Sequence, residues 1–314
     1  MLRPLSLEHA LDPYATRGRR VPTAIELDFL AHLEADGYPA GTRKNYKSAL
    51  NRIDEITGRP AELAGAAECT ELFRSGLGAN TRRLQLSVLR HLHEWLASHG
   101  YPFDETARNA ELPRPKRGAP DPVPGAVMDR LRKVARLVDD LEWKAYFFIL
   151  DGCGVRVHEP LALTVGDVAS LLHRSRDRQL TLRFGHTKTG GWTFPLWDVI
   201  AAGRSSARDV PGLLQRYAMK ARPRGPLYDH EEAPFFAARE TGRGVEWVAN
   251  RWQQHCALAG VHPAPQLRRL RHTFGCEALE LTKDIRRVKA WMNHSSLTTT
   301  ERYAAYVGLQ GSGG

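Results

Sequence analysis

The chain has 314 residues, 42% of them hydrophobic and 25% charged, which is enough for about two globular domains with apolar cores. It carries 45 Lys and Arg against 35 Asp and Glu, and this net charge of +10 favours a polyanionic partner such as nucleic acid. No apolar stretch reaches the roughly 18 residues of a membrane span, and the start lacks the apolar segment of a secretory signal, so we expect a cytoplasmic, nucleoid-associated protein without membrane contact.

The first part of the chain has the pattern of a small helical bundle. Apolar residues recur at helical spacing in four stretches: residues 23–35, 42–56, a short segment near 72, and 80–96. Gly58 ends the second stretch, and Asn80 is a suitable cap for the last. We therefore predict an all-helical domain over residues 23–111, preceded by a short basic tail over residues 1–22.

Basic residues gather near the starts of two of these predicted helices: Arg43, Lys44 and Lys47, then Arg82 and Arg83. Each of them alone is typical of a solvated helix face. As a set in a basic chain, they are also candidate contacts to the phosphates of DNA.

A proline-rich stretch over residues 112–124 separates this part from the rest. It holds five prolines in thirteen residues, and proline both lacks an N–H and restricts the residue before it, so the stretch cannot continue a helix. The charge also changes there: residues 1–118 carry 17 Lys and Arg against 15 acidic residues, and residues 119–314 carry 28 against 20. We expect an extended linker between two domains.

The second domain, predicted over residues 125–307, mixes helices with one hairpin. Helical patterns cover residues 124–138, 143–150, 208–221, 245–259, 270–281 and 284–292. Two apolar stretches, residues 179–184 and 192–196, flank a glycine-containing turn and predict a β-hairpin with Lys188 at its tip. Residues 308–314 have the composition of a flexible tail. The predicted fold class is therefore mainly α with a small β-hairpin.

Several common chemistries leave no signature in this chain. It has no GxxxxGK[ST] loop for nucleotides, no HExxH metal motif and no GxSxG nucleophile elbow. The four cysteines form no CxxC pair. His91 and His93 stand two residues apart and would point away from each other on a helix. We expect neither a cofactor nor a metal ion.

Basic residues and one tyrosine follow in order through the second domain. They lie in the segments GCGVRVHE (152–159), LRHTF (270–274) and NHSSLTTTERY (293–303), with Lys188 between the first two. Taken singly, an Arg three residues before a Glu indicates a local ion pair, and a Tyr near a C-terminus indicates packing. As an ordered set over residues 124–306, they resemble the tyrosine recombinase (phage integrase) family. The helical first domain is similar to the core-binding domain of that family, and the second to its α+β catalytic domain.

This resemblance implies a site-specific recombinase that cleaves and rejoins DNA without metal or ATP. A tyrosine oxygen attacks a phosphodiester and forms a 3′-phosphotyrosine, a role that the resemblance assigns to Tyr303. The nine residues from His294 to Tyr303 fit the family spacing, whereas Tyr306 does not fit it. The other catalytic candidates are Arg156, Lys188, Arg271, His294, Arg268 and Glu159.

Each candidate has a role that its chemistry suits. Arginine is always charged and offers forked donors, so Arg156 and Arg271 are expected to hold the phosphate, with His294 as a further donor. Lys188 is expected to protonate the 5′-oxygen that leaves. Glu159 is expected to orient Arg156 rather than to take part in the chemistry.

Arg268 is a departure from the family pattern. Family members usually have a histidine at this position, three residues before the second arginine, as base or phosphate ligand. An arginine keeps its proton in a protein, so Arg268 can hold a phosphate but cannot accept the proton of the tyrosine. Water, a neighbour such as His272, or no group at all then takes that role. We expect cleavage to become faster as pH rises and Tyr303 loses its proton.

The two predicted domains leave no room for the extra arm-binding domain of larger phage integrases. We therefore expect a recombinase that binds double-stranded DNA with inverted half-sites as a homodimer and forms a homotetramer in the synapse. The short C-terminal tail leaves the coupling between subunits open. Two alternatives remain: a type IB topoisomerase-like enzyme with much the same chemistry, and a DNA-binding protein of the same fold that has lost catalysis.

Overall fold

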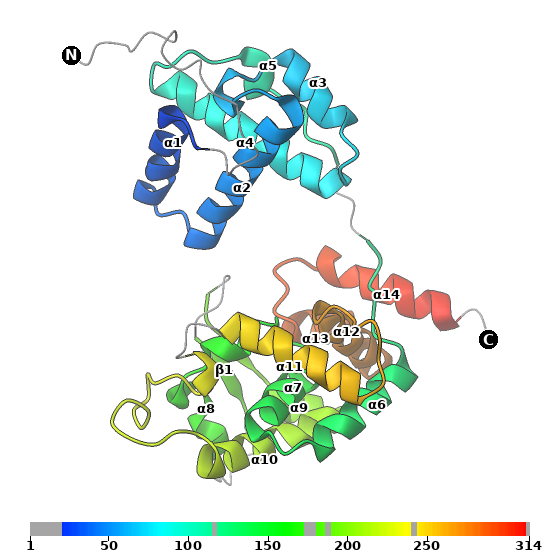
Figure 1. Ribbon diagram of the computed structural model, residues 1–314. Coiled ribbons are helices and arrows are strands. Elements are labelled where there is room, and N and C mark those ends of the chain that lie inside the picture. Colours follow the sequence, from blue (N-terminus) through cyan, green and yellow to red (C-terminus); the bar gives the residue numbers. More distant parts are fainter. Residues whose placement is uncertain (1–20, 115–117, 173–179, 186–189, 240–243, 312–314) are drawn as a thin grey trace. The chain divides into compact units, whose positions relative to one another are not determined.

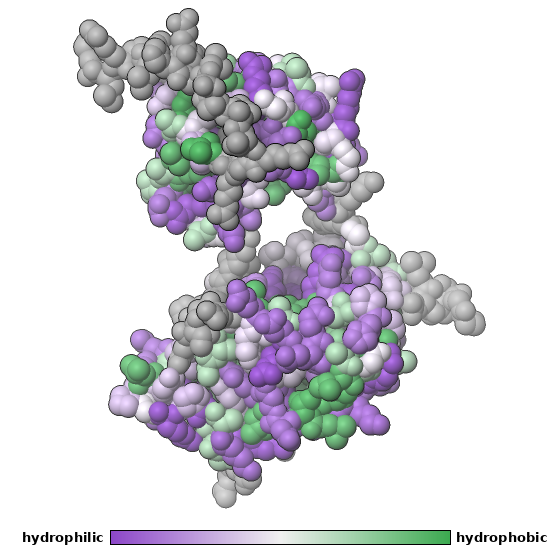
Figure 2. Space-filling model, in the orientation of Figure 1, coloured by the Kyte–Doolittle hydropathy of each residue, from purple (hydrophilic) through white to green (hydrophobic). Residues whose placement is uncertain are grey.

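The structure is a computed structural model that describes residues 21–114, 118–172, 180–185, 190–239 and 244–311. The chain divides into two compact units, residues 1–117 and 118–314, and each unit has its own cluster of buried apolar residues (Figure 1). Both units present a largely hydrophilic face in Figure 2. No helix in the described residues is long and apolar enough to cross a membrane.

The described part of the first unit is helical. Its α-helices are α1 (Ala24–Ala35), α2 (Ala40–Thr57), α3 (Ala66–Arg74), α4 (Ala79–Ser98) and α5 (Glu105–Arg108), with a 3₁₀ turn at Ala61–Leu63. α4 packs against α2, α3 and α5 around buried side chains such as Leu50 and Leu92. Thr23 and Glu26 form a capping box at the start of α1.

Two helix starts in the first unit differ from the sequence-based prediction. α4 begins at Ala79 after Gly78, so Asn80 lies inside the first turn and is not its cap. α2 begins at Ala40, two residues earlier than predicted, directly after Pro39. Neither helix start has a side-chain cap. A capping side chain is the feature by which a sequence marks the first residue of a helix, so these two starts could not be located from it.

The second unit is built around a buried central helix. Its α-helices are α6 (Gly125–Leu137), α7 (Leu141–Cys153), α8 (Val165–Leu172), α9 (Leu196–Ala201), α10 (Ser205–Lys220), α11 (Gly244–Leu258), α12 (Arg268–Thr282), α13 (Ile285–Trp291) and α14 (Thr298–Gly311), with 3₁₀ turns at Pro160–Ala162 and Ala237–Arg239. α7 is buried along most of its length and packs against α6, α10 and α12. A helix that is apolar on all sides belongs inside a unit.

One antiparallel hairpin completes the second unit. Strand β1 (Leu182–Phe184) pairs with β2 (Trp192–Phe194), so that Leu182 lies opposite Phe194. The predicted fold class, mainly α with a small sheet, is confirmed. Residue 179, the predicted start of the first strand, lies outside the described residues. β2 ends at Phe194, and Leu196 instead begins α9.

The C-terminal segment is helical where the sequence predicted a tail. α14 continues through Gly311, so the expected boundary between residues 307 and 308 falls inside this helix. α14 packs against α12 and α13, and it is drawn in red in Figure 1. Burial of Tyr303 in the unit's core gives this Ser- and Thr-rich sequence a packing partner that local propensity does not show.

The chain just before α6 is fixed to the helices of the second unit. The described residues of the predicted linker, 112–114 and 118–124, lie in neither helix nor strand. The backbone N–H of Val123 donates to Thr273 Oγ1 of α12 over 2.9 Å, and Arg269 of α12 donates to the carbonyl of Pro122 over 2.9 Å. Arg302 of α14 donates to the carbonyl of Ala119 over 3.2 Å.

Candidate active site

Arg156 lies in the turn that follows α7. Gly154 ends that helix with a φ of 61°, and a Cβ on it would lie 2.2 Å from Cδ1 of Phe274 in α12, so the position requires glycine. The buried carboxylate of Glu159 accepts from Arg156 Nη1 over 2.8 Å and from the Arg156 backbone N–H over 2.6 Å. Glu159 thereby holds both the backbone and the guanidinium of Arg156.

Arg271 joins this turn to the end of α13. Its Nη1 donates to the carbonyl of Gly154 over 2.8 Å, and its Nη2 donates to the carbonyl of Met292 over 2.5 Å. Burial, and then the positive charge of Arg156, lower the pKa of Arg271 to about 10. The guanidinium groups of Arg156 and Arg271 therefore lie close enough to repel each other, an arrangement that suits a bound anion.

His294 and Tyr303 lie beside this pair of arginines. His294 follows α13 and Asn293, whose φ of 46° is in the left-handed region that Asn tolerates. Its ring lies nearly parallel to that of Tyr303, at an interplanar angle of 13° and a centroid distance of 6.3 Å. Burial, and then the charge of Arg271, lower the pKa of His294 to about 3, so its ring is neutral at physiological pH.

Tyr303 is buried on α14 with its ring against α12. A Cβ placed on Gly275 would lie 2.7 Å from Cε1 and 2.9 Å from Cζ of the tyrosine, so the ring fits only because this helix position is a glycine. Burial raises the pKa of Tyr303, and the nearby charges of Arg271 and Arg302 oppose that rise. The Cζ atom of Arg302 lies 5.8 Å from the centre of the tyrosine ring.

The structure places Arg268 on the surface at the start of α12. No hydrogen bond or ion pair of its side chain occurs among the described residues, and His272 follows one helical turn later. The ring of His272 lies 5.9 Å from that of Tyr303, and its Nδ1 is buried without a partner in the described part of the chain. Burial, and then the charge of Arg302, lower the pKa of His272 to about 4.

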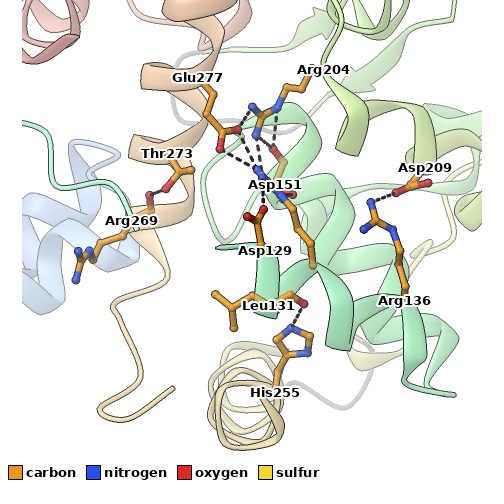
Figure 3. Close-up of polar contacts among 11 residues, drawn as sticks. Asp129, Leu131, Arg136, Asp151, Arg204, Asp209, His255, Arg269, Thr273 and Glu277 are labelled. Atoms are coloured by element: carbon orange, nitrogen blue, oxygen red, sulfur yellow. Dashed lines mark hydrogen bonds and ion pairs between the residues drawn. The ribbon is translucent and has the colours of Figure 1, made fainter. Parts of the chain in front are cut away.

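A buried ionic cluster lies between the elements that carry Arg156 and Arg271 (Figure 3). Asp151 of α7 accepts from Arg132 Nε of α6 over 2.8 Å and from Arg204 Nη2, just before α10, over 3.1 Å. Glu277 of α12 binds the same two arginines. Removing one partner of a buried ion pair typically lowers the free energy of unfolding by about 3–5 kcal/mol. The two shared arginines therefore stabilise the packing of α7 against α12.

Two residues from the sequence analysis remain, Lys188 and the alternative tyrosine Tyr306. Lys188 lies outside the described residues, between β1 and β2. Tyr306 is half-buried on α14 and packs against the core of the second unit.

The five predicted DNA contacts of the first unit fall into two groups. Lys44 and Lys47 are exposed on α2, and Arg43 beside them forms an ion pair with Glu34 of α1. Arg82 Nη1 donates to the carbonyl of Phe73 over 2.5 Å, and Arg83 Nη1 donates to that of Pro113 over 2.8 Å. The two guanidinium groups at the start of α4 therefore also serve contacts inside the unit.

Comparisons with known proteins bear on this arrangement. No protein-family model matches the chain. Two curated relatives are similar to it over most of their length. The tyrosine recombinase XerC of Chromobacterium violaceum is 26% identical over 288 residues, covering 88% of both chains, and that of Rhodospirillum centenum is 27% identical over 307 residues, covering 95% of this chain and 79% of the relative. The chain is thus similar to curated tyrosine recombinases over most of its length.

Solved structures of tyrosine recombinases share its fold. A lambda integrase fragment (residues 75–356), solved as a dimer bound to a COC′ core site, has a TM-score of 0.63 at 14% identity, covering 89% of this chain and 94% of the fragment. XerH recombinase bound to its palindromic difH substrate has a TM-score of 0.62 at 14% identity, covering 90% of this chain and 82% of XerH. Tyrosine recombinases are enzymes, and the similarity to the curated relatives identifies this chain as an enzyme as well.

Sequence reasoning missed three residues that contact the candidate nucleophile Tyr303 or its neighbour His294. Gly275 supports the ring of Tyr303, Arg302 lies over that ring, and Thr300 contacts His294. Gly275 and Thr300 are small residues in a helix, and their spacing carries no signal for a role in a site. The contacts of Gly275 and Thr300 depend on how α14 packs against α12 and α13, which the sequence did not predict.

Formation of a covalent adduct between Tyr303 and DNA is expected to become faster as pH rises from about 7 to 9.5, by about tenfold per pH unit. The reactive phenolate of Tyr303 is scarce below its pKa, which burial raises above the ordinary value of about 10, so its fraction rises throughout this range. The pKa values of His294 and His272, about 3 and about 4, lie below the range, so neither ring titrates in it. Single-turnover rates at saturating protein measure this dependence.

DNA binding measured over the same pH range is the control for this profile. A rate that stays flat from about pH 7 to 9.5 contradicts the expectation. It would indicate instead that a neutral acceptor such as His272 takes the phenol proton throughout the range.

Proposed function

We propose that the chain is a site-specific DNA recombinase that cleaves and rejoins DNA strands through a covalent bond to Tyr303. The observation that carries the proposal is that Arg271 donates to the carbonyl of Gly154 in the turn that carries Arg156, while the helix of Arg271, α12, lies against the buried ring of Tyr303. A phosphodiester is an anion that both guanidinium groups can bind while the tyrosine hydroxyl attacks it. The similarity to curated tyrosine recombinases supports the same reaction.

The proposed reaction is a transesterification. The Oη atom of Tyr303 forms a bond to phosphorus, the bond from phosphorus to the 5′-oxygen breaks, and the phenol proton leaves to water or to a neighbouring base. Lys188 gives a proton to the 5′-oxygen, and the reverse sequence joins a new strand. Arg156, Arg271 and a ring N–H of His294 bind the phosphate oxygens, whose charge grows in the transition state. Arg268, exposed at the start of α12, is a further phosphate contact.

The proposed partner is double-stranded DNA with inverted half-sites. Lambda integrase, of similar fold, is solved as a dimer on a core site and as a tetramer on a Holliday junction. We extend both assemblies to this chain, as a homodimer on one site and a homotetramer in the synapse. The exposed Lys44 and Lys47 of α2, with Arg43, Arg82 and Arg83, are the proposed phosphate contacts of the first unit. An enzyme that acts on DNA in this way would work in the cytoplasm at the nucleoid.

The test is covalent trapping followed by mapping of the attached residue. Duplexes made from the DNA that flanks this gene in its source carry a nick next to each candidate cleavage position, so that the released fragment diffuses away. The protein is incubated with them in EDTA without ATP, and the adduct is digested and sequenced by mass spectrometry. We expect a single modified peptide in which Tyr303 carries the 3′-phosphate.

The other outcomes separate the alternative functions. DNA that is bound but never covalently attached, from pH 7 to 9.5, would indicate a binding protein that has lost catalysis. Attachment together with relaxation of unrelated supercoiled plasmids, and without joining of two sites, would indicate a topoisomerase. An adduct mapped to Tyr306 would overturn the assignment of the nucleophile.

A further inference from the structure

Thr300 contacts His294 from the first turn of α14. Its Oγ1 lies 2.9 Å from His294 Nδ1, and its side chain is fully buried. Because Thr300 stands on the helix that carries Tyr303, one hydrogen bond connects the histidine to the same rigid element as the nucleophile. The contact therefore fixes the direction of the imidazole relative to the tyrosine.

The hydroxyl proton of Thr300 has one available acceptor in the described part of the chain. Other helical threonines donate to the carbonyl four residues earlier, as Thr273 does to Arg269 over 2.9 Å and Thr282 does to Ala278 over 2.8 Å. Thr300 makes no such bond, because the residue four positions earlier precedes α14. If His294 Nδ1 carried a proton and donated, the buried hydroxyl proton would be left without an acceptor, which is costly. Thr300 therefore donates to Nδ1.

The charges around His294 are consistent with this direction. The positive charges of Arg271 of α12, Arg156 after α7, Arg302 of α14 and Lys289 of α13 all act on the ring, and each disfavours an imidazolium. The ring is therefore neutral and carries one proton. With Nδ1 occupied as an acceptor, that proton resides on Nε2.

We propose that Thr300 is a positioning residue, which fixes His294 in the tautomer with its proton on Nε2 and directs that N–H to the phosphate held by Arg156 and Arg271. This inference rests on the proposed function, because it assigns the purpose of the Nε2–H to phosphate binding. The hydroxyl acts only through the histidine. Histidine ligands of metal sites are oriented in the same way by outer hydrogen-bond partners.

The test compares Thr300→Val with Thr300→Ser. Valine keeps the shape of threonine without the hydroxyl, and we expect it to slow covalent adduct formation by about 10- to 100-fold, by analogy with the loss seen when the hydrogen-bond partner of a metal-bound histidine is removed. Serine keeps the hydroxyl and is expected to restore the rate to within about threefold of the wild type, since the donor to Nδ1 is still present. Thr299→Val, one position earlier on the same helix, is the matched control and should leave the rate unchanged.

A second readout reports the tautomer without any reaction. Long-range ¹H–¹⁵N spectra of the full chain distinguish protonated from unprotonated ring nitrogens, and His294→Gln assigns the signal of His294. In the wild type we expect an unprotonated Nδ1 and a protonated Nε2, and in Thr300→Val a mixture of the two tautomers. Thermal unfolding of each variant verifies that it is folded.

The outcomes keep the inference separate from the proposed function. A wild-type chain that forms no adduct overturns the proposed function, while its spectrum still decides the tautomer. A proton on Nδ1 of the wild type, a Thr300→Val rate equal to that of the wild type, or a Thr300→Ser rate as low as that of Thr300→Val overturns the role of Thr300.

Discussion

Tyr303→Phe is expected to abolish covalent attachment to DNA and to leave folding and DNA binding intact. The change removes only the hydroxyl, which is the nucleophile, while the ring keeps its contacts with Gly275 and His294. The loss of adduct should be complete, because no other atom of the side chain can form a bond to phosphorus. Denaturing gels detect the adduct, and fluorescence anisotropy of labelled DNA measures binding.

Tyr306→Phe is the matched control for this variant. Tyr306 stands three residues later on α14 and is half-buried, so the substitution changes the same kind of residue on the same helix. We expect Tyr306→Phe to form the adduct at close to the wild-type rate. Adduct formation by Tyr303→Phe, or its loss in Tyr306→Phe alone, would show that the nucleophile had been assigned to the wrong tyrosine.

Much of the fold follows from patterns that lie within single segments. The apolar periodicity of residues 23–35 and 245–259 predicted helices that the structure has as α1 and α11, with ends within about one residue. α14 could not be predicted in this way. The residues before Tyr303 are rich in Ser and Thr, which favour helices weakly, and the glycines after it suggested a tail. Packing against α12 and α13 stabilises this helix, and the sequence does not show that packing.

The sequence predicted which residues form the candidate site but not the contacts that hold them in place. The arginines, the histidine and the tyrosine belong to motifs with recognisable neighbours, so the sequence alone could nominate them. Their roles stay predictions until the adduct and the variants are measured. Gly275 and Thr300 act through contacts across helix interfaces, where a glycine gives room and a hydroxyl gives one hydrogen bond. Such contacts depend on the relative placement of α12, α13 and α14, which the local sequence does not encode.

Gly275→Ala is expected to slow adduct formation by about 10² or more, and Gly275→Val to reduce it below detection. The new Cβ would lie 2.7–2.9 Å from ring atoms of Tyr303, including the Cζ that carries the hydroxyl, whereas carbon atoms prefer about 3.5–4.0 Å. The ring must therefore move by roughly 1 Å, and a nucleophile misplaced by about that distance typically loses about 10² in rate. Valine adds two further methyl groups at the same contact. Single-turnover adduct formation measures the loss.

Stability separates this displacement from simple unfolding. Alanine is favoured over glycine inside a helix by about 1 kcal/mol, which offsets part of the roughly 1–3 kcal/mol that overpacking costs, so Gly275→Ala should lose at most about 2 kcal/mol of stability even as it loses activity. Gly212→Ala in α10 is the matched control, because a Cβ there has open space around it. Gly212→Ala should gain about 1 kcal/mol of stability and keep the wild-type rate. If Gly275→Ala also keeps that rate, the contact between α12 and Tyr303 does not position the nucleophile. If instead Gly275→Ala melts well below the wild type, the rates are compared at a temperature at which both proteins are folded, and equal rates there contradict the displacement of the ring.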